Sequence, residues 1–284
     1  MSIRPCFIDG TFELFRAFYG APSQRNAAGQ EVGASVALGR SLLSLQRQGN
    51  FTHFAVAFDT VIESFRNQLF AGYKTGEGID PALFGQFVWA ERVTQALGFR
   101  VLSMMEFEAD DGLASATQLF LTLPEVDKVT IASPDKDLMQ LVSERVVTWD
   151  RSRDKEYDAA AVLAKLGVEP RSIPDYLALV GDTADGIPGV PRWGAKSAAV
   201  VLAHYRHLEE IPDDHKKWAV SVRGAQALAE QLVLHRERAL LYRTLATLRC
   251  DVPLALGPAD FLYQGVAEDQ VHTVQEELGV RLLR

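Results

Sequence analysis

Short apolar runs alternate with longer amphipathic segments over the first half of the chain. The apolar runs predict strands at residues 6–8, 53–58, 100–103, 128–132 and 145–148. The segments between them repeat apolar residues with helical spacing and predict helices at about 32–47, 82–97 and 109–121. Strands that alternate with helices are typical of a parallel sheet with helices on its faces. We therefore expect an α/β core with a central, mostly parallel sheet and flanking helices.

The strand pattern fades from about residue 158, and one helical pattern then follows another to about residue 250. Pro253 and Pro258 indicate an irregular stretch, and residues 267–283 predict a final amphipathic helix. We expect a core at 1–157, a helical subdomain at 158–254 and a C-terminal extension at 255–284.

Composition narrows the class of protein. The 284 residues are 48% hydrophobic and 23% charged, the balance of a soluble globular protein with a core. No apolar stretch approaches the ~20 residues that a membrane span needs. The N-terminal MSIRPCFIDG lacks the long apolar region of a secretory signal. With only Cys6 and Cys250, both in apolar surroundings, we expect reduced thiols in a cytoplasmic protein with no membrane partner.

The net charge of −8 argues at first against a nucleic-acid partner. Residues 1–185 account for it with 25 acidic and 17 basic residues, and nine of these acids are the candidate site residues described below. Residues 186–250 instead hold six acidic residues and ten basic ones: Arg192, Lys196, Arg206, Lys216, Lys217, Arg223, Arg236, Arg238, Arg243 and Arg249. The first part is thus acidic where a site needs cations, and the later part is basic enough to meet phosphates.

Acidic residues recur at the carboxyl ends of the predicted strands, where open parallel sheets place their ligands. Seven follow a strand or open the helix behind it, and two come later: Asp9, Asp59, Glu108, Asp110, Asp111, Asp135 and Asp137, then Asp182 and Asp185. Any one of them alone is explained by a helix cap or a turn. Several carboxylates that converge on one sheet edge repel each other unless a counter-charge is present. Divalent cations with oxygen ligands supply that charge, so the set predicts a metal site.

A metal held by carboxylates alone is typical of phosphate chemistry, in which two ions activate a water and stabilise the leaving oxygen. The six histidines show no HxH or HExxH spacing, which argues against zinc. Neither a GxxxxGK(S/T) loop nor a GxGxxG follows a predicted strand, so nucleotide-binding folds lose their main support. The residues themselves therefore indicate a metal-dependent nuclease.

Several motifs, taken in order, resemble those of the 5′-nuclease or flap endonuclease family, in the bacterial form that precedes DNA polymerase I or stands alone. They lie between about residues 3 and 254: FIDG, AVAFD, Phe65-Arg66, Tyr73-Lys74, EADD, DKDLMQLV and DYLALVGDTADGIPGVPRWGAKSA. The resemblance implies a PIN-like nuclease core and a helical DNA-binding subdomain with a helix-hairpin-helix-like motif. It implies a stand-alone 5′-3′ exonuclease or flap endonuclease that cuts DNA at or near a 5′ flap, nick or end.

The resemblance also implies roles for single residues. A first metal would be held or surrounded by Asp9, Glu108, Asp110, Asp111, Asp135 and Asp137. A second would be served by Asp182 and Asp185 with Asp59 nearby, both ions being Mg²⁺ with Mn²⁺ able to substitute. Lys74 would reach the scissile phosphate, and Arg66 would steady the site. A hairpin at 186–196 would grip duplex DNA and is a candidate K⁺ site, through Gly186, Gly189, Val190, Arg192, Gly194, Lys196 and Ser197.

The chain departs from the family in the arch region at about 72–92. Family members follow Tyr-Lys with a basic stretch, whereas TGEGID follows Lys74 here and no basic residue comes before Arg92. We expect weaker threading of single strands and a stronger dependence on the duplex grip. Phe84, Phe87, Val88 and Trp89 are expected to pack against the domain rather than to stack on bases.

Two other functions stay open at this point. A single-domain PIN-type ribonuclease would share the carboxylates without needing the hairpin at 186–196. A protein that binds branched DNA without cutting it would gain nothing from a negative centre beside phosphates. The protein is expected to be a monomer.

Overall fold

A computed structural model describes residues 3–283 and divides into two compact units. Unit 1 comprises Met1–Ser64, Thr75–Ser133 and Arg249–Arg284, and unit 2 comprises Phe65–Lys74 and Pro134–Leu248. Both units are therefore assembled from separate segments of the chain. The three consecutive parts expected from the sequence stay a prediction.

Unit 1 is built on four parallel strands. β1 (Pro5–Asp9) pairs with β2 (His53–Asp59) on one side and with β4 (Val129–Ala132) on the other. β3 (Arg100–Met104) pairs with the free side of β2. Every residue of β1, β2 and β4 is buried, which explains why these strands read as unbroken apolar runs without alternation. Four strands expected from the sequence are confirmed to within one or two residues.

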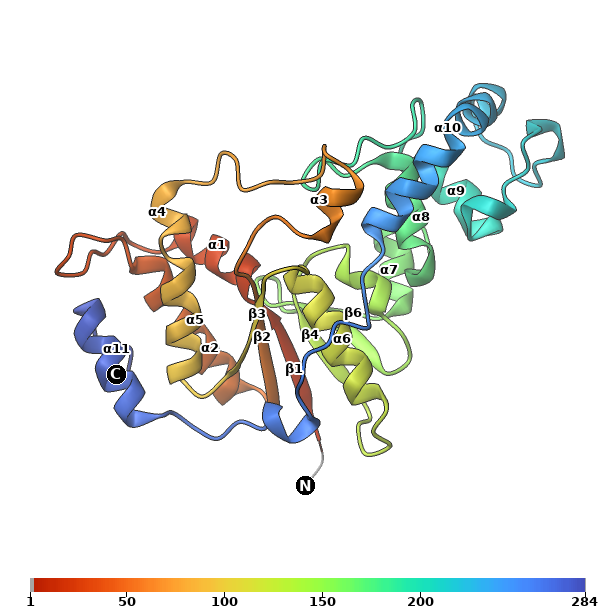
Figure 1. Ribbon diagram of the computed structural model, residues 1–284. Coiled ribbons are helices and arrows are strands. Elements are labelled where there is room, and N and C mark those ends of the chain that lie inside the picture. The colour runs from red at the N-terminus through yellow and green to blue at the C-terminus, as the bar shows by residue number, and fades with distance from the viewer. Residues whose placement is uncertain (1–2, 284) are drawn as a thin grey trace. The chain divides into compact units, whose positions relative to one another are not determined.

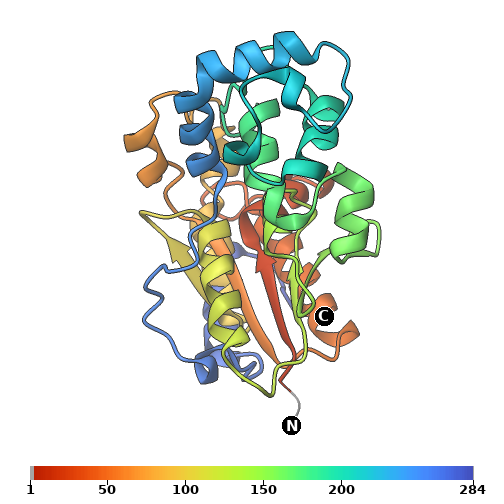
Figure 2. The same ribbon diagram turned by 90° about the vertical axis from the view of Figure 1, so that its right-hand side faces the viewer.

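Helices cover both faces of this sheet (Figure 1). The helical elements of unit 1 are α1 (Gly10–Gly20), α2 (Gly33–Gln48), α4 (Pro81–Phe84), α5 (Phe87–Ala96), α6 (Ala109–Leu121), the 3₁₀ turn η5 (Pro258–Phe261) and α11 (Glu268–Leu278). α6 packs on the strands from one face and crosses in front of them in Figure 2, while α1, α2 and α5 lie on the other face. The strands are thereby shielded, and their carboxyl ends are left to carry polar groups.

Two helices differ from the sequence expectation. The helix expected at 82–97 is divided into α4 and α5, because Asp80 caps α4 just before Pro81 and Gly85 ends it. The helix expected at 267–283 ends at Leu278, since Gly279 takes a positive φ of 65° that terminates a helix.

Unit 2 is mainly helical, with one antiparallel hairpin of β5 (Val146–Asp150) and β6 (Lys155–Tyr157). Its helical elements are α3 (Phe65–Leu69), η1 (Leu138–Leu141), α7 (Ala159–Leu166), η2 (Pro170–Ser172), α8 (Ile173–Val180), α9 (Ala195–Tyr205), η3 (Leu208–Glu210), η4 (His215–Lys217) and α10 (Ala225–Ala246). α8 is the centre of this unit, since both α9 and α10 pack on it around a buried apolar core. The strands of residues 3–283 are thus mostly parallel, with flanking helices and a helical later part, which confirms the expected fold class.

Membrane insertion finds no support in the helices. Within residues 3–283 no helix combines the length and the apolarity that a bilayer crossing demands. The longest, α10, carries charged residues along its length and is kinked at His235.

Candidate metal centre

A tight loop after α8 presents two aspartates in unit 2. Gly181 and Gly189 take positive φ angles of 82° and 74°, and a Cβ atom on either would lie within 2.7 Å of backbone atoms. Only glycine fits such positions. Asp182 and Ile187 exchange two backbone hydrogen bonds of 2.8 Å across the loop. These two bonds hold the loop closed, and Asp182 and Asp185 both belong to it.

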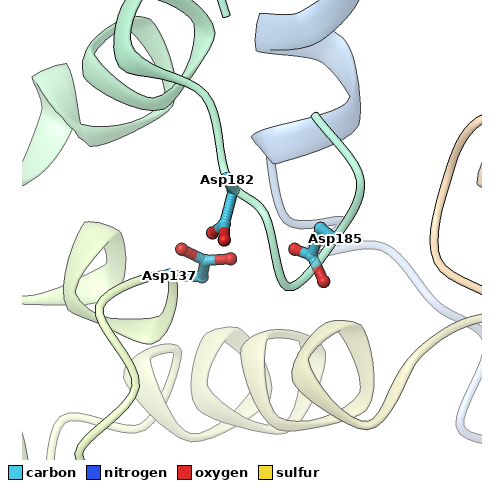
Figure 3. A group of neighbouring side chains, drawn as sticks. All are labelled: Asp137, Asp182 and Asp185. Atoms are coloured by element: carbon cyan, nitrogen blue, oxygen red, sulfur yellow. The ribbon is translucent and has the colours of Figure 1, made fainter. Parts of the chain in front are cut away.

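Asp137, Asp182 and Asp185 come together in unit 2 (Figure 3). One carboxylate oxygen from each lies within 4.8 Å of the other two. Asp137 follows Asp135, whose Oδ1 atom accepts the Asp137 backbone N–H at 2.8 Å, and this turn fixes the direction of the side chain. Three oxygens at this spacing are suitable ligands for a hard divalent cation. We call these three residues the aspartate trio.

The Asp137 side chain shows that a cation fits the trio. Its Oδ1 atom is buried and accepts no hydrogen bond from any residue in 3–283. Burial raises the pKa of Asp137 well above its ordinary value of 3.8, and the neighbouring carboxylates raise it further. A buried acceptor without a donor is costly, and a bound divalent ion would satisfy it. The donor set and its charge therefore fit a metal.

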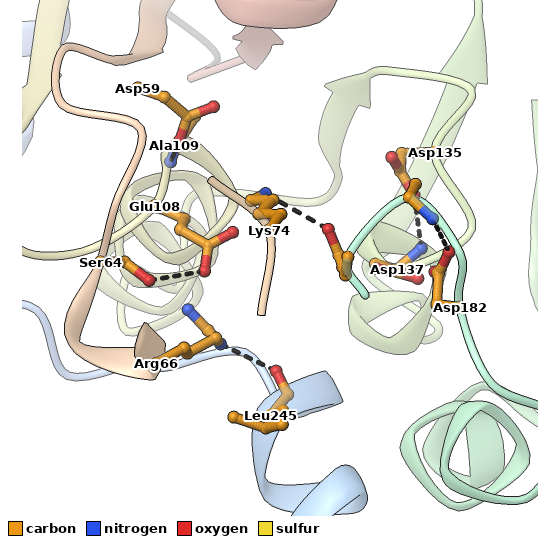
Figure 4. A network of polar contacts seen from close by, with 12 residues as sticks. Asp59, Ser64, Arg66, Lys74, Glu108, Ala109, Asp135, Asp137, Asp182 and Leu245 are labelled. Atoms are coloured by element: carbon orange, nitrogen blue, oxygen red, sulfur yellow. Dashed lines mark hydrogen bonds and ion pairs between the residues drawn. The ribbon is translucent and has the colours of Figure 1, made fainter. Parts of the chain in front are cut away.

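Two lysines lie against the trio, and Figure 4 labels one of them, Lys74. Lys136 Nζ is 2.5 Å from Asp182 Oδ2 and 3.7 Å from Asp137 Oδ1. Lys74 Nζ is 3.4 Å from Asp185 Oδ1. Burial alone would lower the pKa of Lys136, but the surrounding carboxylates raise it well above its ordinary value, so Lys136 stays charged. Lys136 was not among the expected site residues, although the DKD motif places it between two of them.

The segment that carries Lys74 is fixed to the loop by close backbone contact. Gly186 has a φ of 70°, and a Cβ atom there would lie 2.2 Å from the Gly72 carbonyl oxygen. The Lys74 N–H donates to the Asp185 carbonyl at 3.0 Å, and Asn67 Nδ2 donates to the Lys74 carbonyl at 2.9 Å. Gly186, expected as a DNA-binding residue, thus has a packing role as well.

Arg66 is almost fully buried, with 1% of its surface exposed. Its Nε donates to the Leu245 carbonyl at 2.8 Å (Figure 4), and one terminal nitrogen donates to the Thr247 carbonyl at 3.0 Å. These acceptors end α10, where orphan carbonyls and the helix dipole favour a cation. Arg66 therefore ties the Lys74 segment to α10, and its expected role in steadying the site stays a prediction.

Two candidates in unit 1 end neighbouring strands, as the sequence predicts. Asp9 ends β1 and accepts from the Phe12 N–H at 2.8 Å and from the Ser133 hydroxyl at 3.1 Å. Asp59 ends β2 and accepts from the Ala109 N–H at 2.8 Å, which joins β2 to the start of α6 (Figure 4). Both aspartates are therefore oriented by hydrogen bonds at the carboxyl end of the sheet.

The EADD motif opens α6, and its three acidic side chains differ in their burial and in their hydrogen bonds. Glu108 Oε1 accepts from the Ser64 hydroxyl at 2.9 Å, whereas Asp110 is partly exposed in the first turn. Asp111 is fully buried and accepts from the N–H groups of Glu108, at 3.0 Å, and Arg249, at 2.8 Å. Asp111 thus acts as a cap and a tether. Within the described part of the chain, the unit 1 acids form no trio among themselves as close as that of unit 2.

A basic cavity of about 540 Å³ in unit 2 gathers most of the expected DNA-binding residues. Its lining comprises Arg192, Gly194, Ala195, Lys196, Ser197, Val200, Ser221, Val222 and Arg223. It opens at the N-terminus of α9, where free N–H groups and the helix dipole favour an anion. Gly189 and Val190 shape the loop before the cavity but do not line it.

Arg223 was missed by sequence reasoning. It lies outside the motif, in the segment before α10, and only the tertiary fold brings it to the cavity. The general excess of basic residues at 186–250 was the one available signal.

Only some of the large apolar residues of the arch region pack against the domain. Phe87 is buried as expected, but Phe84 and Val88 are 53% and 65% exposed. They line a cavity of about 340 Å³ in unit 1 together with Glu91 and Arg92. Trp89 is partly buried, so the expectation that these four residues would pack inward is wrong for Phe84 and Val88, which lie on exposed positions of α4 and α5.

Two family models together cover most of the chain. One, described as the N-terminal resolvase-like domain of a 5′-3′ exonuclease, matches residues 4–167. The other, described as the C-terminal SAM fold of a 5′-3′ exonuclease, matches residues 168–269. The chain belongs to the 5′-3′ exonuclease family. This confirms the resemblance seen in the motifs.

The matching relatives include a protein much longer than this chain and one of similar length. DNA polymerase I of Mycobacterium leprae is 35% identical over 285 residues, which cover 98% of this chain and 30% of the polymerase. The chain thus spans about three-tenths of the length of that relative. A 5′-3′ exonuclease of Buchnera aphidicola is 29% identical over 258 residues, which cover 90% of both chains.

Solved structures share the fold. A zinc-bound 5′-exonuclease of T5 superposes with a TM-score of 0.71 at 21% identity, over 97% of this chain and 99% of that one. A flap endonuclease of bacteriophage T5 in a complex with DNA and metal ions gives a TM-score of 0.70 at 19% identity, with the same coverage. At these identities the likeness supports the fold, and divalent metal ions are bound in such structural neighbours.

Proposed function

We propose that this chain is a structure-selective 5′ nuclease that hydrolyses phosphodiester bonds at or near the 5′ end of branched or duplex DNA. The observation that carries this proposal is the aspartate trio, with its buried unsatisfied oxygen and a lysine at its edge. The family assignment and the metal-bound and DNA-bound neighbours support it. The preference between exonuclease and flap-endonuclease action is left to the experiment below.

Two divalent ions are proposed as cofactors, Mg²⁺ with Mn²⁺ able to substitute. The trio would hold one of them. The acids that end the strands and open α6 in unit 1 would serve the other: Asp9, Glu108 and Asp110, with Asp59 as a supporting acid and Asp111 orienting the start of α6. When bound, such ions lower the pKa of a water and stabilise charge on the leaving oxygen.

The residues of the chain itself would orient the scissile phosphate and neutralise its charge. The ammonium group of Lys74, held at the edge of the trio, is placed to meet a non-bridging oxygen of the scissile phosphate. In the hydrolysis the water oxygen bonds to phosphorus and the bond from phosphorus to the leaving oxygen breaks. One proton of the water passes to that oxygen, so the products are a phosphate monoester and an alcohol, with no change in oxidation state.

The basic cavity is proposed to hold the duplex. Arg192, Lys196 and Arg223 carry three positive charges around the N-terminus of α9, where a backbone phosphate would be attracted. K⁺ on carbonyl oxygens at 186–196 stays part of this proposal. It predicts that replacing K⁺ by Li⁺ at equal ionic strength weakens duplex binding.

One experiment separates the candidate functions. Labelled 5′-flap DNA, blunt duplex and single-stranded RNA are incubated with the protein in Mg²⁺ or EDTA, beside Asp182→Ala and Asp135→Ala. Asp127→Asn, an exposed loop carboxylate, serves as the matched control. We expect Mg²⁺-dependent cleavage of the DNA substrates by wild type and the control, and its loss in the two site variants.

The other outcomes are equally informative. Flap cleavage that persists in both site variants would remove the metal assignment. Cleavage of RNA alone would indicate the PIN-type ribonuclease, and binding of branched DNA without cleavage would indicate the non-cleaving protein.

A further inference from the structure

The acidic group of unit 2 is balanced in part by the chain itself. The carboxylates of the aspartate trio carry negative charge when ionised, and the ammonium groups of Lys74 and Lys136 lie against them. The chain therefore already supplies part of the positive charge that a metal ion would bring.

The two lysines are not equivalent. Lys74 Nζ is 3.4 Å from Asp185, an ion pair longer than a strong hydrogen bond. Lys136 Nζ makes a short bond of 2.5 Å to Asp182 Oδ2 and is also 3.7 Å from the buried, unsatisfied Asp137 Oδ1. Lys136 therefore contacts two members of the trio at once.

A metal ion at the trio would meet the Lys136 ammonium group at Asp182, because Oδ2 accepts from Lys136 and Oδ1 accepts from the Ala184 N–H at 3.1 Å. Mg²⁺ binds carboxylate oxygens at about 2.0–2.1 Å and demands near-ideal geometry. An ammonium group that donates to Asp182 Oδ2 uses a lone pair that a metal ion would otherwise take. The Lys136 side chain is 36% exposed, so its long stem has a path to water when the head group leaves Asp182.

We propose that Lys136 is a built-in counter-ion that competes with a divalent metal ion for Asp182 and thereby sets the metal affinity of the trio. This inference rests on the proposed metal site at the trio and concerns its regulation. Without metal, the ammonium group relieves repulsion between Asp137 and Asp182. With metal, it releases Asp182. Lys136 thus sets the metal affinity through its contacts with two carboxylates, those of Asp137 and Asp182.

The test measures metal binding and not activity. Mn²⁺ is titrated by calorimetry into the full chain after removal of metals, for wild type, Lys136→Met and Lys136→Arg. Lys217→Met, an exposed lysine of unit 2, controls for the change in net charge. We expect Lys136→Met to bind Mn²⁺ about tenfold more tightly, the order of effect that one adjacent charge has on a carboxylate. Lys136→Arg and Lys217→Met should stay within about twofold of wild type.

Two further measurements keep the proposal falsifiable. The tighter binding should vanish when Lys136→Met is combined with Asp182→Asn, because the two groups then no longer compete. In EDTA, Lys136→Met should unfold at a lower temperature than wild type, and Mn²⁺ should raise that temperature by more than it does for wild type.

The outcomes separate the inference from the function on which it rests. Equal or weaker Mn²⁺ binding by Lys136→Met, with Asp182-dependent binding in wild type, overturns the counter-ion role and leaves the nuclease proposal standing. Absence of any Asp182-dependent Mn²⁺ binding in wild type overturns the metal site, and the counter-ion role with it.

Discussion

Lys74 is fixed to Asp185 twice, once through the backbone and once through the side chain. Its N–H donates to the Asp185 carbonyl at 3.0 Å, and its Nζ lies 3.4 Å from Asp185 Oδ1. The backbone bond sets where the side chain begins, and the ion pair sets where it ends. A cation held in advance at the edge of a carboxylate group needs little reorganisation when charge develops on a phosphate.

The first prediction concerns this lysine. Lys74→Ala should lower the single-turnover cleavage rate by about 100-fold, because a preorganised positive charge is lost from the reacting phosphate. Duplex affinity, measured by fluorescence anisotropy in Ca²⁺, should change by less than about threefold, since Lys74 is a single charge that is paired with Asp185 and lies outside the basic cavity. Lys217→Ala is the control. Equal losses in rate and affinity would show Lys74 to be an anchor only.

The pH dependence of stability follows from the raised pKa of Asp137. Between the unfolded and the folded pKa the folded state binds more protons, so stability falls as pH rises through this window. In EDTA, the free energy of unfolding of wild type should therefore fall relative to Asp137→Asn from pH 4 upward. Urea unfolding of both proteins at several pH values measures this difference. A difference that is constant with pH would contradict the buried, crowded carboxylate.

Most of the sheet and the acid positions could be predicted from the sequence for a simple physical reason. Strands buried on both faces are apolar throughout, and the first polar residue marks their end, as at Asp9 and Asp59. β6, by contrast, is three residues long, with an exposed Lys155 and Glu156, and carries no such pattern. It exists because it pairs with β5.

The parts that were missed depend on contacts between distant residues. Lys136 meets Asp182 across 46 positions of the chain, and nothing in the DKD motif says which carboxylate its side chain reaches. Arg223 joins the basic cavity in the same way, through the path of the segment before α10. Asp111 was expected as a metal ligand from its motif, and only the structure shows its two tethering hydrogen bonds.

Arg66 should contribute to stability more than its neighbours. Arg66→Ala removes a charged donor from the Leu245 and Thr247 carbonyls and should cost about 3 kcal/mol of unfolding free energy, given about 1.5–3 kcal/mol for each charge-assisted bond. Arg238→Ala, an exposed arginine on α10, should change it by less than about 0.5 kcal/mol. Urea denaturation measures both, and equal effects would contradict the role of Arg66 at the end of α10.

Arg223 should contact a phosphate if the basic cavity binds duplex DNA. Arg223→Ala should then weaken binding to every duplex sequence alike, and the slope of log affinity against log salt should become shallower by about 0.9. Anisotropy titrations at several KCl concentrations, in Ca²⁺ to prevent cleavage, provide both numbers. Arg238→Ala is again the control, and an unchanged slope for Arg223→Ala would place the duplex elsewhere.

Arg192 separates DNA binding from stability, because its backbone and its side chain make opposite demands. Its φ of 69° lies in the left-handed region, which costs a residue with a Cβ atom about 1 kcal/mol or more. Arg192→Gly should relieve that strain and raise the free energy of unfolding by roughly 0.5–1 kcal/mol, after allowing for the greater freedom of glycine in the unfolded chain. It should also weaken duplex binding, since a positive charge leaves the cavity. Arg192→Ala would lose the charge and keep the strain, so a gain in stability for both variants would refute the backbone argument. Undiminished duplex binding by both would show that the strained arginine is not maintained for its contact with DNA.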